Sequence, residues 1–157
     1  MGIQSSGKLT LLNTMFGVQM RTNLGQCTRG VNTQLLAVEG RPECDYILLL
    51  DTEGLRAPEY HGLPDSEKRD NQMATLSILL ADATIVVNPA EVDAAIKEIL
   101  PVVLVAYQGS KLAEDNGDRL STMMFFVYNR IDTTQKDKMS NIIQSLASSL
   151  DKALCAD

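Results

Sequence analysis

The sequence has few of the residues from which disulfide frameworks and metal centres are built. Its 157 residues include only three cysteines and one histidine, and it has no tryptophan. An odd, scattered set of cysteines predicts free thiols and a reducing, intracellular compartment. We expect the cytoplasm, with the nucleus as a second site. No apolar run has the length of a membrane span, and no stretch has the pattern of a signal peptide.

An excess of basic residues is missing as well. Fourteen lysines and arginines face twenty acidic residues, which gives a formal net charge of −6. Proteins that bind nucleic-acid backbones are usually basic, so we expect no nucleic-acid partner, whereas a nucleotide needs only a local positive pocket. A hydrophobic content of 45% with 22% charged residues predicts one packed domain.

What the sequence does contain starts at its second residue. Residues 2–8 read GIQSSGK, the G-x-x-x-x-G-K pattern of a phosphate-binding loop. In such loops the glycines let backbone N–H groups surround the phosphates, and the lysine reaches the β and γ oxygens. The next position normally supplies a hydroxyl to Mg²⁺, but here it is Leu9, and Thr10 lies about 100° farther around the helix. We expect partial retention of nucleotide binding and impaired Mg²⁺-dependent turnover.

Hydrophobic periodicity predicts an alternation of helices and strands, and therefore an α/β fold with a mostly parallel sheet covered on both faces. A turn at 39–42 predicts one antiparallel hairpin. In the second helix we expect a serine cap at Ser66, a solvated face at 67–70, and an apolar stripe of Met73, Leu76, Leu79 and Leu80. The predicted helices are 7–16, 66–82, 92–107 and 136–153, and the predicted strands are 34–38, 46–50, 83–88 and 123–128.

Polar residues follow the ends of two predicted strands. Asp51 could hold a Mg²⁺-bound water, and Gly54 could offer its N–H to a γ-phosphate. An ordinary Asp/Gly turn explains residues 51–54 equally well. Asp132 could accept both N–H groups of guanine, a contact worth about 1 to 3 kcal/mol of discrimination. Asn129 would tie this loop to the phosphate loop, and the stem of Arg130 would lie over the base. A helix cap is the alternative here.

Thr28 lies between the first helix and the hairpin. A threonine in this connection could close over the γ-phosphate and ligate Mg²⁺ through its hydroxyl. An ordinary loop threonine is an equally good interpretation of its position alone.

Taken in order, these elements resemble the guanine-nucleotide-binding domain of the very large interferon-inducible GTPases, which are related to dynamin and the guanylate-binding proteins. Residues 11–17, 27–30 and 51–59 are also similar to that family. The resemblance implies a G domain, a P-loop three-layer sandwich that binds GTP and GDP with Mg²⁺, hydrolyses GTP and self-associates through its nucleotide face. By motif, the catalytic residues are Gln4, Ser5 and Thr28, and the metal ligands are Thr28 and Asp51. The nucleotide contacts are Gly2, Ser5, Ser6, Gly7, Lys8, Leu9, Thr10, Gly54, Asn129, Arg130 and Asp132.

The chain departs from the family pattern at several positions. Leu55 follows Gly54 where Ras-like GTPases place a water-orienting glutamine. A catalytic arginine could come from Arg29, Arg56 or a partner subunit, and the sequence does not choose among them. Only Met1 precedes the loop, so we expect residues 1–157 to form a partial G domain without its first central strand, a fragment of a larger GTPase.

Two other functions remain open at this point. One is a degenerate, non-hydrolysing G domain that serves as a nucleotide-binding or assembly module, which Leu9 favours. The other is an ATPase of the same fold, against which Asp132 argues.

Overall fold

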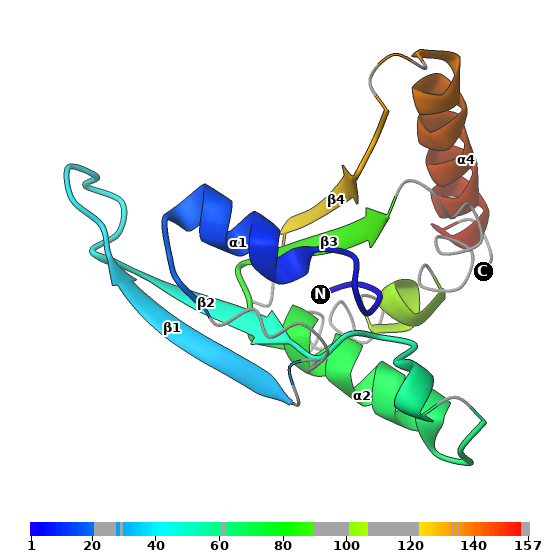
Figure 1. Ribbon diagram of the computed structural model, residues 1–157, viewed down its shortest axis with the longest axis horizontal. Helices are drawn as coiled ribbons and strands as arrows, with labels where there is room; N and C mark the ends of the chain where they lie inside the picture. The colour runs from blue at the N-terminus through cyan, green and yellow to red at the C-terminus, as the bar shows by residue number, and fades with distance from the viewer. Residues whose placement is uncertain are drawn as a thin grey trace.

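The structure is a computed structural model, and it describes residues 1–20, 28, 30–60, 62–89, 101–106, 123–132, 134 and 136–154 (Figure 1). In this part of the chain the fold is mixed α/β, with one antiparallel and one parallel strand pair. The elements in order are α1 (Lys8–Phe16), β1 (Val31–Ala37), β2 (Tyr46–Thr52), the 3₁₀ helix η1 (Pro58–Tyr60), α2 (Ser66–Leu79), β3 (Ala83–Pro89), β4 (Met123–Asn129) and α4 (Lys136–Leu154).

The predicted elements are confirmed in kind and nearly in extent wherever the structure describes them. Helix α1 ends at Gly17, which takes the left-handed conformation that glycine favours at a helix C-terminus. Of the predicted helix 92–107, residues 101–106 are described and helical, and the other positions lie outside the described residues.

The predicted hairpin is present, and it is longer than expected. Strand β1 pairs antiparallel with β2, with Leu35 opposite Leu48. The ladder continues to the pair of Val31 and Thr52, so it includes polar residues that we had assigned to the flanking loops. Backbone pairing does not need apolar side chains, and this extension holds Asp51 within β2.

The second strand pair is parallel, with Val86 of β3 opposite Phe126 of β4. Its register brings the ends of the two strands together, with Pro89 opposite Asn129. The continuous β-branched run of β3 is largely buried, as its sequence predicted.

The first three residues lie between the two strand pairs (Figure 1). Gly2 forms a parallel bridge with Val87 of β3, and Ile3 forms one with Leu55 beyond the end of β2. Backbone hydrogen bonds of 2.9 Å join Val87 N to Met1 O and Leu55 N to Gly2 O. A Cβ on Gly2 would lie 2.1 Å from Val87 O, so this position requires glycine. The start of the phosphate loop is therefore fixed to both halves of the fold.

The main hydrophobic core lies around this junction. It contains Met1, Leu55, Ala74, Ile78, Val86, Val103 and Ala106. A smaller cluster joins Leu104 to Ile142 of α4.

The predicted apolar stripe of α2 is correct only in part, and its predicted N-cap is wrong. Met73 of the stripe packs against the main core. The helix buries Asp70, Ala74, Ser77 and Ile78. Leu76 and Leu80 of the predicted stripe are 41% and 62% exposed. Ser66 is the first helical residue, and Asp65 occupies the N-cap position in its place. The buried face includes small residues where α2 packs against β2 and β3, and a partnered aspartate, a combination that apolar periodicity does not detect.

Candidate nucleotide site

The phosphate loop closes around its own lysine. Lys8 Nζ donates hydrogen bonds to Gly2 O at 3.2 Å and Ile3 O at 2.8 Å. Ser5 and Gly7 have positive φ angles of 61° and 84°, so the backbone curls tightly before α1 begins at Lys8. The first turn of α1 contains no acidic residue of its own, and the N-terminus of a helix carries the positive end of its dipole. A cation and a helix N-terminus thus meet at one loop, the arrangement that binds phosphate.

The loop after β4 reaches this phosphate loop directly. Asn129 Nδ2 donates a hydrogen bond to Ser6 O at 3.0 Å, across 123 positions of sequence. Asn129 Oδ1 accepts from Arg130 N at 2.9 Å, so both ends of the amide are engaged. Ser6 is fully buried and contributes its carbonyl to this contact. The predicted tie between the two loops is confirmed.

Asp132 is held by a turn of its own loop. Its Oδ1 accepts hydrogen bonds from the backbone N and the hydroxyl of Thr134, at 3.0 and 2.6 Å. Asp132 and Arg130 are exposed, and Arg130 has a φ of 62°. Sequence reasoning missed Thr134. A hydroxyl two residues after an aspartate is the signal of such a turn, and it could have identified this residue.

Two predicted metal ligands lie in direct contact. The Thr28 hydroxyl donates to Asp51 Oδ2 at 2.8 Å, and Asp51 is buried at the end of β2. Hydroxyl and carboxylate oxygens are ligands that Mg²⁺ prefers, so this pair fits the ion. Among the residues that the structure describes, no group of three His, Cys, Asp or Glu side chains could hold a metal. A Mg²⁺ ion here would need further oxygens from phosphate and water.

Glu53 is a residue of this site that the sequence interpretation missed. It is only 4% exposed, and Gly30 N donates to its Oε2 at 3.1 Å. Arg69 Nη2 donates to the same oxygen at 2.6 Å. Burial raises the pKa of Glu53, but the hydrogen bonds from Arg69 and Gly30 outweigh that effect and hold the pKa below its usual value. Glu53 is therefore an ionised, buried carboxylate beside the Thr28 loop.

The predicted solvated face of α2 is confirmed at Glu67, Lys68 and Arg69, which are exposed, and it is wrong at Asp70, which is buried. The Arg69 guanidinium also binds Glu53, which the sequence did not predict. Four charged residues in a row resemble a solvated surface. The carboxylate that recruits Arg69 lies sixteen positions away and has no sequence signal.

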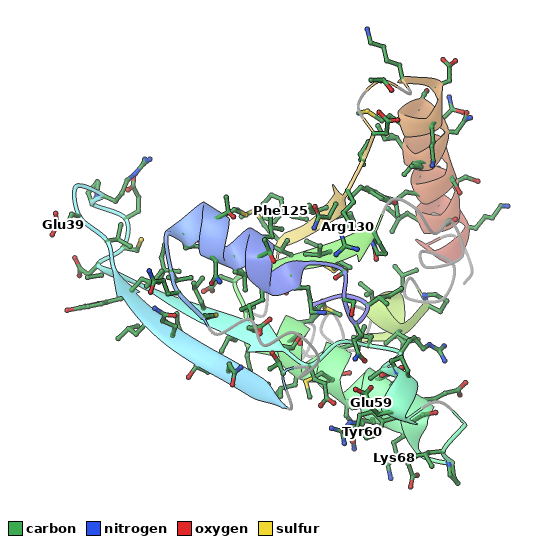
Figure 2. All side chains as sticks on the ribbon, viewed as in Figure 1. Glu39, Glu59, Tyr60, Lys68, Phe125 and Arg130 are labelled. Atoms are coloured by element: carbon green, nitrogen blue, oxygen red, sulfur yellow. The ribbon has the colours of Figure 1, made fainter. Side chains whose placement is uncertain are left out.

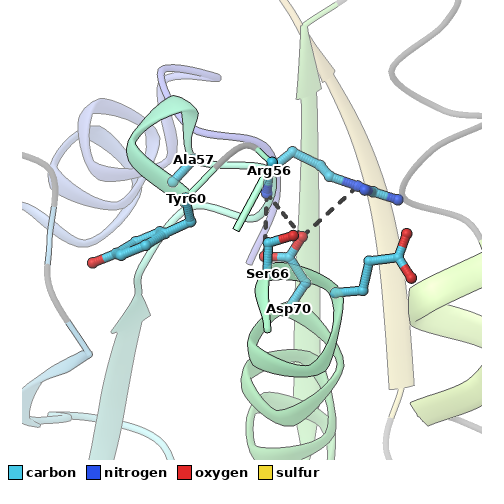
Figure 3. A pocket seen from close by; sticks show the side chains of 7 residues that line it. Arg56, Ala57, Tyr60, Ser66 and Asp70 are labelled. Atoms are coloured by element: carbon cyan, nitrogen blue, oxygen red, sulfur yellow. Dashed lines mark hydrogen bonds and ion pairs between the residues drawn. The ribbon is translucent and has the colours of Figure 1, made fainter. Parts of the chain in front are cut away.

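Arg56 is anchored to α2 beside a small cavity. Its backbone N donates to the two carboxylate oxygens of Asp70 at 3.3 and 3.2 Å, and its Nε lies 3.7 Å from Asp70 Oδ2 (Figure 3). Burial raises the pKa of Asp70, and the N–H of Arg56 offsets part of that rise. The cavity has a volume of about 260 Å³ and is lined by Arg56, Ala57, Tyr60, Gly62, Ser66, Glu67 and Asp70. Arg29, the other candidate for a catalytic arginine in this chain, lies outside the described residues.

The phosphate loop packs closely, at Gln4, on the segment after β2. A Cβ on Gly54 would lie 2.5 Å from Gln4 Cα, and Gln4 Nε2 donates to Glu59 Oε1 of η1 at 3.2 Å. Leu55 is 1% exposed and belongs to the core. The position that orients water in Ras-like GTPases is therefore occupied by a core residue in this chain.

Leu9 and Thr10 lie in the first turn of α1. Leu9 is half-buried and Thr10 is exposed. Their effect on a bound ion stays a prediction.

No helix in the described part of the chain is long and apolar enough to cross a membrane.

Comparison with known proteins identifies the family. The family model of the URGCP-like GTPase domain matches residues 1–154. The chain is 36% identical over 164 residues to interferon-induced very large GTPase 1 of Mus musculus, covering 100% of this chain and 6% of that protein. It is 41% identical over 111 residues to the Homo sapiens protein of the same name, covering 68% of this chain and 4% of that one. It is 39% identical to the up-regulator of cell proliferation of Mus musculus over 68% of this chain and 11% of the relative. The chain thus spans a small fraction of the length of these relatives, and it belongs to the URGCP-like GTPase domain family.

Proposed function

We propose that this chain binds GTP and GDP, with Mg²⁺, at the surface formed by the phosphate loop and the ends of β2 and β4. The observation that carries this proposal is the 3.0 Å hydrogen bond from Asn129 Nδ2 to Ser6 O. It joins the loop predicted to read the base to the loop predicted to hold the phosphates. A guanine nucleotide contacts both loops at once, so their attachment is what such a ligand requires.

Each part of the nucleotide has a candidate partner. Lys8 and the amides at the start of α1 bind the β and γ phosphates. To do so, Lys8 Nζ gives up its hydrogen bonds to Gly2 O and Ile3 O and donates to phosphate oxygens instead. Asp132 accepts the N–H groups of guanine. Thr28 and Asp51 hold Mg²⁺, which neutralises charge on the phosphate oxygens.

We extend the proposal to the fold. The strand pairs and the segment between them follow the order β1, β2, residues 1–3, β3, β4, which the hydrogen bonds and bridges support. This order suits a single sheet of a P-loop sandwich, with α1 and α2 packed against it. The nucleotide then lies at the edge where the parallel strands end, as in other open α/β sheets.

For hydrolysis we propose slow turnover assisted by Gln4 and Ser5. Leu9 supports the slow rate, because it offers Mg²⁺ no oxygen where the family pattern has a hydroxyl. Asp70 holds Arg56, which leaves Arg29 or an arginine of a second copy as the source of a stabilising cation. Self-association through the nucleotide face would supply the latter.

The binding proposal is tested by titrating fluorescent GTP, GDP and ATP into the 157-residue chain, with and without Mg²⁺. We expect guanine nucleotides to bind, ATP to bind roughly 5- to 150-fold more weakly as a bidentate base contact predicts, and Lys8→Met to abolish triphosphate binding. Lys136→Met, at the exposed start of α4, is the matched control. Equal affinity for ATP and GTP would contradict guanine recognition, and no binding of any nucleotide would support a nucleotide-free module.

A further inference from the structure

One contact joins α2 to Glu53 at the end of β2, and three more join the end of β2 to the loop that carries Thr28. Arg69 Nη2 lies 2.6 Å from Glu53 Oε2, and Gly30 N donates to that same oxygen at 3.1 Å. Glu53 N in turn donates to Gly30 O at 2.8 Å. Two residues before Gly30, the Thr28 hydroxyl binds Asp51 at 2.8 Å. The loop is thus attached to the end of β2 at two points, and one of them depends on the Glu53 side chain.

The Glu53 carboxylate is paired with the Arg69 guanidinium where it lies. Its side chain is 5% exposed, so it has lost most of its contact with water. A buried carboxylate that loses its counter-charge is unfavourable in that position, and it turns out towards solvent. Such a movement would take Glu53 Oε2 away from Gly30 N and break the 3.1 Å hydrogen bond between them.

Arg69 is itself held in position. Its guanidinium carbon lies 4.1 Å from the centre of the Tyr60 ring, and its side chain is 44% exposed. Stacking on an aromatic ring restricts a long side chain that would otherwise sample many rotamers. An ordinary surface ion pair contributes little, but this one joins a stacked arginine to a buried carboxylate.

We propose that Arg69 is a positioning residue of the nucleotide site, which fixes Glu53 and through it holds Gly30 and Thr28 against the end of β2. This inference rests on the proposed binding of guanine nucleotide. Thr28 is the residue expected to close over a γ-phosphate, which GDP lacks. Arg69 therefore favours GTP over GDP, although it lies on α2 and contacts neither nucleotide.

The test compares Arg69→Met with Lys68→Met, which removes the same charge from an exposed neighbour on α2 (Figure 2). Two quantities are measured on the 157-residue chain: the ratio of GTP to GDP affinity in Mg²⁺, and hydrogen exchange of the Gly30 amide without nucleotide. We expect Arg69→Met to lower the affinity ratio about tenfold and to speed Gly30 exchange, because Arg69 no longer holds Glu53 Oε2 against that amide. Lys68→Met should change neither quantity.

Two further variants separate positioning from general stability. Arg69→Lys keeps a cation within reach of Glu53 and should recover much of the affinity ratio. In a Glu53→Gln background no buried charge remains, so Arg69→Met should have a smaller effect than in the wild type, and this double variant also guards against misfolding of the single one.

The possible failures can be told apart. If the wild type binds no guanine nucleotide, the proposed function is wrong and the selectivity role of Arg69 falls with it. If the wild type binds GTP and GDP but Arg69→Met leaves the affinity ratio and the Gly30 exchange unchanged, only the role of Arg69 is overturned. An equal effect of Arg69→Met in both Glu53 backgrounds would also overturn it, since Arg69 would then act by another route.

Discussion

The ends of β2 and β4 both carry acidic residues of the candidate site, but they are built differently. At the end of β2, Asp51 and Glu53 are 3% and 4% exposed, and their partners Thr28 and Arg69 come from other parts of the chain. At the end of β4, Asp132 is exposed, and its described partner Thr134 lies two residues away.

This difference separates two kinds of residue within one site. The β2 end is part of the packed interior, so its charged side chains need internal partners. Substituting Asp51 or Glu53 should therefore affect stability and binding together. The β4 end is a surface turn tied to the phosphate loop through Asn129, so its substitution should affect base selection alone. In the proposed site, recognition of the phosphates would thus depend on the packed interior, and recognition of the base would depend on a surface turn.

The largest expected effect is Gly54→Ala, which tests how tightly the β2 end is packed. The added Cβ would lie 2.5 Å from Gln4 Cα and 2.7 Å from Gln4 N, both backbone atoms. We expect a loss of about 3 kcal/mol, at the upper end of what overpacking costs, visible as a large fall in Tm. Gly40→Ala is the reference, because a Cβ there would have no atom within 4 Å and the substitution would cost only the backbone strain of alanine at a φ of 72°. Equal losses from the two substitutions would show that the β2 end is not close-packed.

The next effect is on the β4 end alone. Asp132→Asn keeps an oxygen that can accept from Thr134 but replaces one carboxylate oxygen with a donor that opposes the N–H groups of guanine. We expect a loss of about 1 to 3 kcal/mol in GTP binding, which is roughly a 5- to 150-fold weaker affinity. The Tm without nucleotide should not change. Calorimetric titration measures the GTP affinity, and thermal denaturation measures the Tm. A fall in Tm without a loss of GTP affinity would show that Asp132 serves stability and not base binding.

Leu9→Ser tests the phosphate loop, to which both ends contribute. A serine supplies the missing hydroxyl, so we expect Mg²⁺-dependent GTP hydrolysis to rise by about tenfold, less than the roughly 100- to 1,000-fold attributed to one charge-stabilising contact with the reacting group. Leu9→Ala removes the same apolar bulk without adding an oxygen and should produce a smaller gain. Equal hydrolysis rates for the two variants would show that the gain comes from removing the leucine side chain and not from a new oxygen ligand for Mg²⁺.

The smallest effect is on the pH dependence of stability. The folded state lowers the pKa of Glu53 below its usual value of 4.5, so the stabilisation from its ionised form is present above pH 4.5 and is lost as the pH falls through the folded pKa. Glu53→Gln should therefore be less stable than the wild type at pH 7, and the difference should shrink in acid. Denaturant unfolding across this range measures it. A difference that does not vary with pH would mean that the Glu53 charge is not the stabilising feature.

Much of the fold could be predicted from the sequence, for identifiable reasons. The β-branched run at 83–88 and the helical spacing at 8–16 are local patterns, and the structure has the expected elements at both places. The phosphate loop and the loop at Asn129 were also predicted to meet, because the order of the motifs matched a family and fixed the topology.

The parts that could not be predicted depend on contacts between distant residues. Nothing in Glu53 or in the run at 67–70 signals that Arg69 reaches a buried carboxylate. The exposed Leu76 of α2 shows the same limit, because apolar spacing does not reveal that a helix buries a partnered aspartate and a serine. The contact between Thr134 and Asp132 is local, and the turn that the two residues form could have been predicted from the sequence.

Guanine recognition by the loop after β4 can be tested by following backbone amide shifts by NMR while GTP–Mg²⁺ and then ATP–Mg²⁺ are added to the wild-type chain. We expect GTP to shift two groups of amides together, one at Gly7 and Lys8 and the other at 129–132, and ATP at the same concentration to leave the second group unchanged. If GTP and ATP shift the same amides at the same concentrations, the site does not recognise guanine, and the role assigned to the β4 end is wrong.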